Sequence, residues 1–138
     1  MRTLAALLLA LAVACGSDSP EAQVRKAFAE AVGAVESGDA PKALDALHAD
    51  FRGPEGMSKA DAGLYLMGWL RKEKVGVTVL AQRLDLRGAE ATQTVDLLLT
   101  GKGAGSALPE ERSRRTLTLR WVRVGKGWRI REILAAGA

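Results

Sequence analysis

His48 is the single histidine of the chain, and Asp50 follows it two residues later. An imidazole beside a carboxylate could act as a general base at the mouth of a pocket, because its pKa lies close to neutral pH. The same histidine stands near the expected end of a helix, where it would interact with the last carbonyl groups and with the helix dipole. His48 and Asp50 are therefore candidate catalytic residues, and a helix-terminal role for His48 is the alternative.

Aromatic side chains are the second group that could form a site. They could line a ligand pocket, and a partly apolar pocket would suit a lipid, a sterol-like molecule or an aromatic compound. Aromatic residues at core spacing usually pack in the core, so plain packing is the alternative. The candidate pocket residues are Tyr65, Trp69, Trp121 and Trp128.

Metal or phosphate chemistry finds no support in the spacing of residues. The chain has one cysteine and one histidine, and its carboxylates show no ligand spacing, so we expect no metal and no cofactor. The glycine-rich segment 101–105 matches no phosphate-binding loop, and no helical pattern follows it directly. We expect that segment to be part of a hairpin loop.

Cys15, the only cysteine, ends an apolar run of eleven residues from Leu4 to Ala14, with Arg2 in front of it. This run is too short to cross a bilayer and is typical of a signal peptide. Its end, Ala12-Val13-Ala14-Cys15, resembles the lipobox of bacterial lipoproteins, although Ala12 stands where leucine is usual. The resemblance implies that residues 1–14 are removed and that Cys15 is lipidated. The alternative is an ordinary signal peptide, cut before Cys15, that leaves a free thiol.

A lipid on Cys15 would place the protein in the cell envelope. Gly16 follows, where an aspartate would resemble the inner-membrane retention signal of enteric bacteria, so we expect the periplasmic side of the outer membrane. Residues 15–19 would form the lipidated end and tether, and four residues reach at most about 14 Å. The domain, residues 20–138, would therefore stay close to its membrane, and nucleic acid is not an expected partner of an exported protein.

Helical periodicity dominates the first half of the domain, and strand periodicity the second. Ser19-Pro20 is typical of a helix start, and Ser58 to Asp61 resembles a capping box. The patterns predict three helices, then a meander of antiparallel strands, with a turn or short strand at 51–56. The helices are expected at about 20–37, 39–48 and 58–72, and the strands at 75–86, 91–100, 114–124 and 128–134.

The order of these elements resembles the nuclear transport factor 2-like fold, a group that includes SnoaL-like cyclases and ketosteroid isomerases. Two stretches carry the resemblance, SGDAPKALDALHADFRG (Ser37 to Gly53) and LRWVRVGKGWRIREI (Leu119 to Ile133). It implies an α+β domain in which the helices pack on a curved antiparallel sheet and leave a conical pocket. A cystatin-like sheet around a helix is the nearest alternative.

The chemistry of ketosteroid isomerases does not carry over from this resemblance. Their general-base aspartate is expected near the stretch that matches Phe51 to Glu55, and that stretch contains none. An oxyanion-hole tyrosine is expected in the first helix, whose only aromatic residue is Phe28. Both absences speak against that reaction.

Cations gather in the last two strands, where some would share one outer face of the sheet. Such a face could contact anionic lipid headgroups or an acidic protein partner, or it could be a solvated surface. The residues are Arg112, Arg114, Arg115, Arg120, Arg123, Lys126, Arg129 and Arg131.

Taken together, these patterns favour a membrane-anchored envelope lipoprotein that binds a small apolar ligand or a protein partner without catalysis. The resemblance also implies a homodimer formed through the sheet. One alternative is an enzyme that uses His48 or Asp50 as general base in the cone. The other is a structural or assembly protein of the envelope.

Overall fold

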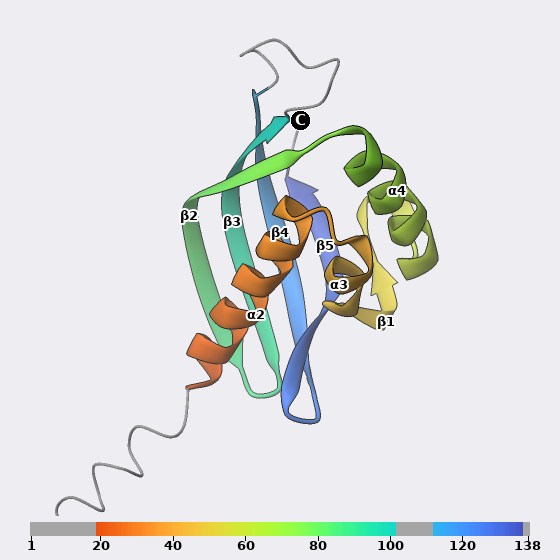
Figure 1. Ribbon diagram of the computed structural model, residues 1–138. Coiled ribbons are helices and arrows are strands. Elements are labelled where there is room, and N and C mark those ends of the chain that lie inside the picture. The colour runs from red at the N-terminus through yellow and green to blue at the C-terminus, as the bar shows by residue number, and fades with distance from the viewer. Residues whose placement is uncertain (1–18, 102–111, 137–138) are drawn as a thin grey trace, which may run out of the picture.

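The computed structural model describes residues 19–101 and 112–136. Its helices lie together over one face of a curved sheet (Figure 1). This arrangement confirms the predicted α+β architecture. The helical elements are α2 (Pro20–Glu36), α3 (Ala40–Asp45), the 3₁₀ turn η1 (Pro54–Gly56) and α4 (Lys59–Lys72).

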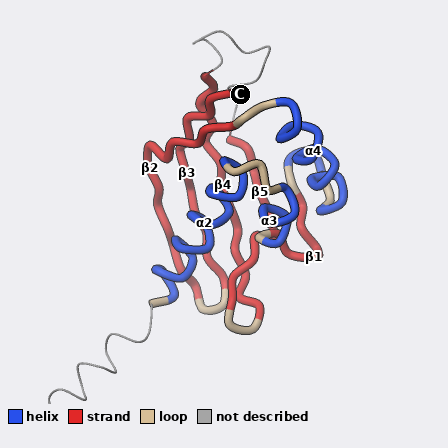
Figure 2. Tube along the Cα trace, viewed as in Figure 1, coloured by secondary structure: helices blue, strands red, loops and turns tan. Residues whose placement is uncertain are grey.

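Five strands form one sheet in the order β1-β5-β4-β3-β2 (Figure 2). The last four strands in the chain form the predicted antiparallel meander. Irregularities in register between β2 and β3, between β4 and β5 and between β1 and β5 accompany the bending of the sheet. The strands are β1 (Leu47–Arg52), β2 (Val75–Arg87), β3 (Glu90–Gly101), β4 (Arg112–Val124) and β5 (Gly127–Ala136).

Strand β1 corrects two predictions. The second helix does not continue to His48 but ends at Asp45, and β1 pairs parallel with β5, so the sheet is mixed rather than wholly antiparallel. Leu47 and Phe51 are buried at either end of this strand, and the N–H of Ile130 donates to the carbonyl of Ala46 at 2.7 Å. Burial and pairing with β5 therefore override the local helical pattern.

Side chains cap the helices where the sequence predicts helix starts. The hydroxyl of Ser19 accepts a hydrogen bond from the N–H of Ala22 at 3.1 Å, which caps α2. Ser58 and Asp61 form a reciprocal capping box at the start of α4. Within the described ranges, no helix has both the length and the apolar character needed to cross a bilayer.

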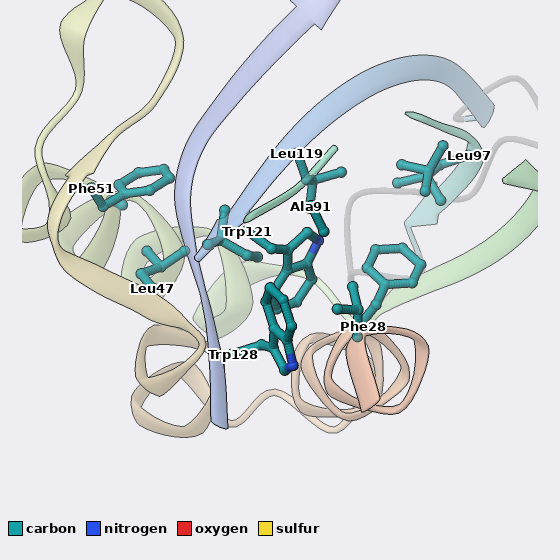
Figure 3. Packing of buried hydrophobic residues seen from close by; sticks show 12 residues of the cluster. Phe28, Leu47, Phe51, Ala91, Leu97, Leu119, Trp121 and Trp128 are labelled. Atoms are coloured by element: carbon teal, nitrogen blue, oxygen red, sulfur yellow. The ribbon is translucent and has the colours of Figure 1, made fainter. Parts of the chain in front are cut away.

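The core lies between the helices and the covered face of the sheet. Val24 and Phe28 of α2 face the sheet, and Phe51 of β1 joins the same cluster. Figure 3 shows these layers in close-up, with the indoles of Trp121 and Trp128 inside the core. The leader, Cys15 and the glycine-rich segment after Gly101 lie outside the described residues.

Candidate ligand cavity

A cavity of about 550 Å³ lies between the helices and the sheet. Helix α2 contributes its second half, including Phe28, Val32 and Val35, and α4 contributes Leu66 on another side. The wall formed by the sheet consists mainly of aliphatic side chains. It includes Val77, Leu97, Leu99, Leu117, Leu119 and Ile133.

The period of the strands brings these sheet residues to one face. Successive side chains of a strand point to opposite sides, so Leu117 and Leu119 share the covered face. Antiparallel register then sets Leu119 opposite Ile133 and Val77 opposite Leu99. Four strands thus present a continuous apolar wall to the cavity.

Two of the four aromatic residues predicted at a pocket lie in its wall. Tyr65 and Trp69 occupy successive turns of α4, with ring centroids 6.0 Å apart. The indole N–H of Trp69 donates to the carboxylate of Glu73 at 3.2 Å, which fixes the orientation of the ring. Tyr65 is 60% exposed, so it lies at the rim of the cavity.

The other two, Trp121 and Trp128, are not among the residues that line the cavity. Trp121 is fully buried opposite Ala91, and its indole N–H donates to the side-chain oxygen of Gln93 at 2.9 Å. The indole N–H of Trp128 donates to the side-chain oxygen of Gln23 at 3.2 Å. Both indoles are buried beside each other between α2 and the sheet, so they close one end of the helix–sheet interface (Figure 3).

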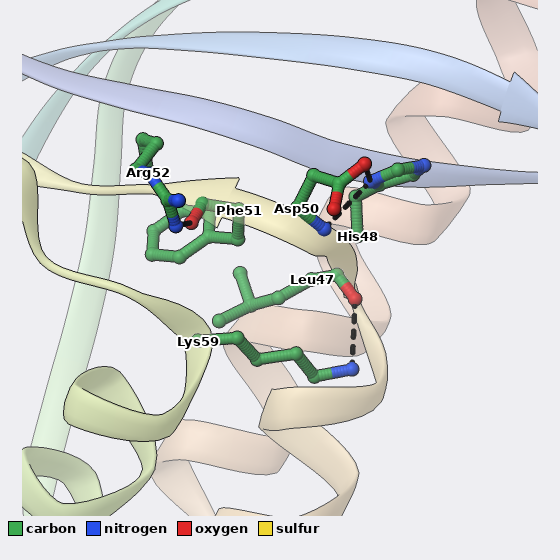
Figure 4. Close-up of polar contacts among 6 residues, drawn as sticks. All are labelled: Leu47, His48, Asp50, Phe51, Arg52 and Lys59. Carbon is green, nitrogen blue, oxygen red and sulfur yellow. Dashed lines mark hydrogen bonds and ion pairs between the residues drawn. The ribbon is translucent and has the colours of Figure 1, made fainter.

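His48 and Asp50 lie together on β1, outside the cavity wall (Figure 4). The backbone N–H of Asp50 donates to Nδ1 of His48 at 3.0 Å, and the Asp50 carboxylate lies 4.0 Å from the same nitrogen. The Asp50 side chain is 77% exposed. His48 stands in a strand, so the structure also replaces the helix-terminal interpretation.

Lys59 and Leu47 join α4 to β1 beside this pair. The ammonium group of Lys59 donates to the carbonyl oxygen of Leu47 at 3.0 Å (Figure 4). Helix α4 packs mainly against α3 and β1, not against the long strands across the cavity. This attachment to the edge strand holds α4 away from the long strands β2 to β5 and leaves space between them.

The arginines of β4 do not form one uncompensated face. Arg114 is bound to the carboxylate of Asp96, and this hydrogen bond is the main cause that lowers the pKa of Asp96. Arg120 lies 3.9 Å from the carboxylate of Glu132. Arg115, one residue after Arg114, instead lines the cavity. The expected cationic face is therefore divided between two sides of the sheet and is partly neutralised.

Arg115 belongs to the group of cations expected partly on an outer face, and the structure places it in the cavity wall. Leu117 and Leu119 share one face of this strand through their alternation, and Arg115 continues the same alternation. That period would have separated it from Arg114 and Arg120. Within residues 19–101 and 112–136, no three His, Cys, Asp or Glu side chains are grouped so that they could hold a metal ion.

Comparison with known proteins relates the chain to others by structure alone. No protein-family model matches the sequence, and no curated protein matches it. The structure is similar to Bd1075 of Bdellovibrio bacteriovorus, with a TM-score of 0.72 and 11% identity over 83% of this chain. That protein is larger, and this chain spans 40% of its length.

Smaller proteins match over nearly their whole length. An NTF2-like protein from Cytophaga hutchinsonii has a TM-score of 0.72 at 13% identity, covering 88% of this chain and 100% of that one. An NTF2-like superfamily protein from Salmonella enterica has a TM-score of 0.69 at 14% identity, covering 83% of this chain and 87% of that one. Identities this low show the fold alone. The described part of this chain has the nuclear transport factor 2-like fold.

Proposed function

We propose that this protein binds a small apolar ligand in the cavity between its helices and its sheet. The observation that carries the proposal is the wall of that cavity. Its volume, about 550 Å³, falls within the range of roughly 300–1,000 Å³ that is usual for small-molecule sites. Aliphatic and aromatic side chains form nearly all of its surface, and Arg115 is the one charged residue among the described residues that line it.

The energetics of packing support a ligand there. Protein interiors are normally filled to the density of organic crystals, and unfilled space forfeits dispersion contacts. An apolar molecule in the cavity would restore those contacts and would bury its own surface at about 25 cal/mol per Å². The wall contains few polar groups, so the ligand would be held mainly by its shape and by its exclusion from water.

We further propose that the domain works in the cell envelope, anchored by lipid on Cys15 at the periplasmic side of the outer membrane. The support is the apolar run Leu4 to Ala14 and the lipobox-like Ala12-Val13-Ala14-Cys15. Each buried methylene of an acyl chain contributes about 0.8 kcal/mol, so two or three chains on one cysteine would hold the protein firmly.

Native mass spectrometry of the protein purified from its own membranes tests the ligand. The wild type should carry an additional mass that organic extraction removes. Ala31 lines the cavity and Ala29 is exposed on the same helix, so Ala31→Phe should lose that mass while Ala29→Phe keeps it. No bound small molecule, or equal retention by both variants, would count against the proposal.

Fractionation tests the anchor. Cys15→Ser should move the protein out of the membrane fraction, and the wild-type mass should exceed that of the mature chain by its acyl groups. Ser17→Ala, two residues away, is the control and should remain in the membrane fraction. The anchor is refuted if Cys15→Ser stays membrane-bound with a mass changed only by the substitution.

The two alternatives rest on other parts of the molecule. His48 and Asp50 lie outside the cavity wall, so an enzyme that uses either as base in the cone has no geometric support. A structural or assembly protein would bind through its surface. Co-purification of a defined protein partner without any small molecule would favour that second alternative.

A further inference from the structure

Three arginines of β4 lie close together in sequence but differ in their partners. Arg114 and Arg120 each lie beside a carboxylate of a neighbouring strand, Asp96 and Glu132. The guanidinium of Arg115 forms no ion pair with any described residue, and its one described side-chain hydrogen bond runs from Nη1 to the carbonyl oxygen of Arg114 at 3.2 Å. Its positive charge is therefore not balanced by an acidic group of the described domain.

The position of Arg115 makes this charge significant. It is exposed to water, yet it also lines the cavity, opposite Leu97 and two residues before Leu117. No aspartate, glutamate or histidine is among the described residues of that wall. The apolar cavity thus carries a single charge, which is positive and lies where the wall meets solvent.

This arrangement selects a ligand by charge as well as by shape. A guanidinium group binds carboxylates through two parallel N–H donors, and such bonds are about twice as strong as neutral ones. A ligand with an apolar body and one anionic end would bury the body and leave that end beside Arg115. A cationic end would be repelled there, and a neutral end would not use the charge.

We propose that the ligand is a single-chain amphiphile with a carboxylate head, that is, a long-chain free acid whose head pairs with Arg115. This inference rests on the proposed function and names the ligand class for the same cavity. The apolar wall accounts for binding of the chain. Arg115 accounts for preference among molecules with the same chain and different heads.

Photo-crosslinking in native membranes tests the inference without detergent. The protein is expressed from its full-length sequence. Membranes receive either a diazirine-bearing hexadecanoic acid or the matching hexadecanol, and labelled peptides are mapped by mass spectrometry. The acid should label segments that line the cavity, such as 28–35 and 97–99, more strongly than the alcohol.

Arg115→Gln should reduce labelling by the acid about tenfold, the factor expected for loss of a charge-assisted hydrogen bond. Labelling by the alcohol should not change in that variant. Arg120→Gln is the matched control on the same strand and should leave both probes unaffected. Arg115→Lys should keep part of the preference, and equal thermal melting of all variants shows that each is folded.

The outcomes separate this inference from the proposed function. If neither probe labels the cavity, binding of an apolar ligand in the cavity is refuted. If acid and alcohol label equally, and Arg115→Gln changes neither, the cavity binds apolar molecules without regard to charge. That second result overturns the present inference and leaves the proposed function intact.

Discussion

The two ends of the helix–sheet interface differ sharply, although α2 and the same strands build both. One end, here called the closed end, is filled by Trp121, Trp128, Gln93, Val24 and Val95, of which none is more than 3% exposed. The other, the open end, contains the cavity of about 550 Å³. The two ends of one interface thus have different packing.

The difference arises from side-chain size and from the placement of α4. At the closed end, Trp121 lies opposite the small Ala91, and both indoles are buried and bind amide side chains. At the open end, the strands present aliphatic residues of moderate size, and α4 packs on α3 and on the edge strand β1 instead of on the four long strands. We infer that the closed end supplies stability while the open end is available for a ligand.

Removing a large side chain from the closed end should lower the free energy of unfolding more than any other change considered. Trp121→Ala should lower the free energy of unfolding by about 3–5 kcal/mol, because it removes a fully buried indole and leaves a cavity. Urea unfolding followed by circular dichroism measures the loss. Leu99→Ala in the cavity wall is the comparison and should cost less, since that side chain already borders unfilled space. Equal losses would show that the two ends do not differ in packing.

Removing the buried amide should have the next largest effect. Gln93 is fully buried, accepts from Trp121 and donates to the side chain of Gln82 at 3.1 Å. Gln93→Leu should cost about 1–3 kcal/mol, because the indole N–H loses its buried acceptor. Trp121→Phe removes that N–H, so the double variant should lose less stability than the sum of the two single losses. Strictly additive losses in the double variant would contradict this account.

Enlarging a small side chain should lower stability at the closed end and have little effect at the open end. Ala91→Leu at the closed end should cost about 1–3 kcal/mol through overpacking. Ala31→Leu at the open end should change stability by less than about 1 kcal/mol, because the cavity accepts the added methyl groups. Thermal unfolding of both variants measures the two losses of stability. A greater loss in Ala31→Leu than in Ala91→Leu would contradict the prediction.

The smallest effect on stability is expected from a change in the capping box at the start of α4. The N–H and hydroxyl of Ser58 donate to the Asp61 carboxylate, and the first of these bonds is the main cause that lowers its pKa below 3.8. Such a carboxyl contributes stability that is complete above its ordinary pKa and is lost as pH falls through the lower folded value.

Asp61→Asn should therefore be less stable than the wild type at neutral pH, and the gap should narrow as the pH falls below 3.8. Thermal midpoints across a pH series measure the gap. Glu55→Gln, a neighbouring exposed acid outside the capping box, is the control. A gap that stays constant down to low pH would rule out the Asp61 carboxylate as its source.

Local chemistry made much of the fold predictable. Ser19 and the Ser58–Asp61 capping box mark helix starts through side-chain hydrogen bonds within three residues, and strand alternation marks the meander. β1 was missed because its identity depends on pairing with β5, which lies some eighty residues later in the chain. Local helical periodicity at 39–48 could not reveal that partner.

The site was less predictable than the fold, for a physical reason. Tyr65 and Trp69 face a cavity and Trp121 does not, although all are aromatic residues at core spacing. Which of them borders a hollow depends on where α4 attaches, and that is a tertiary property. Lipidation of Cys15 remains a prediction, since the residue lies outside the described ranges.

Helix α2 has a further consequence for how an anchored protein would meet its surroundings. It has seventeen residues, so at about 1.5 Å per residue it separates its two ends by about 25 Å. The first turns of α2 lie at the closed end, where Gln23 binds Trp128, whereas the cavity lies along the second half of the helix. An upright domain held by lipid on Cys15 would present its closed end to the bilayer and its cavity to the aqueous compartment. A ligand would then enter and leave at the end of the domain that faces away from the bilayer.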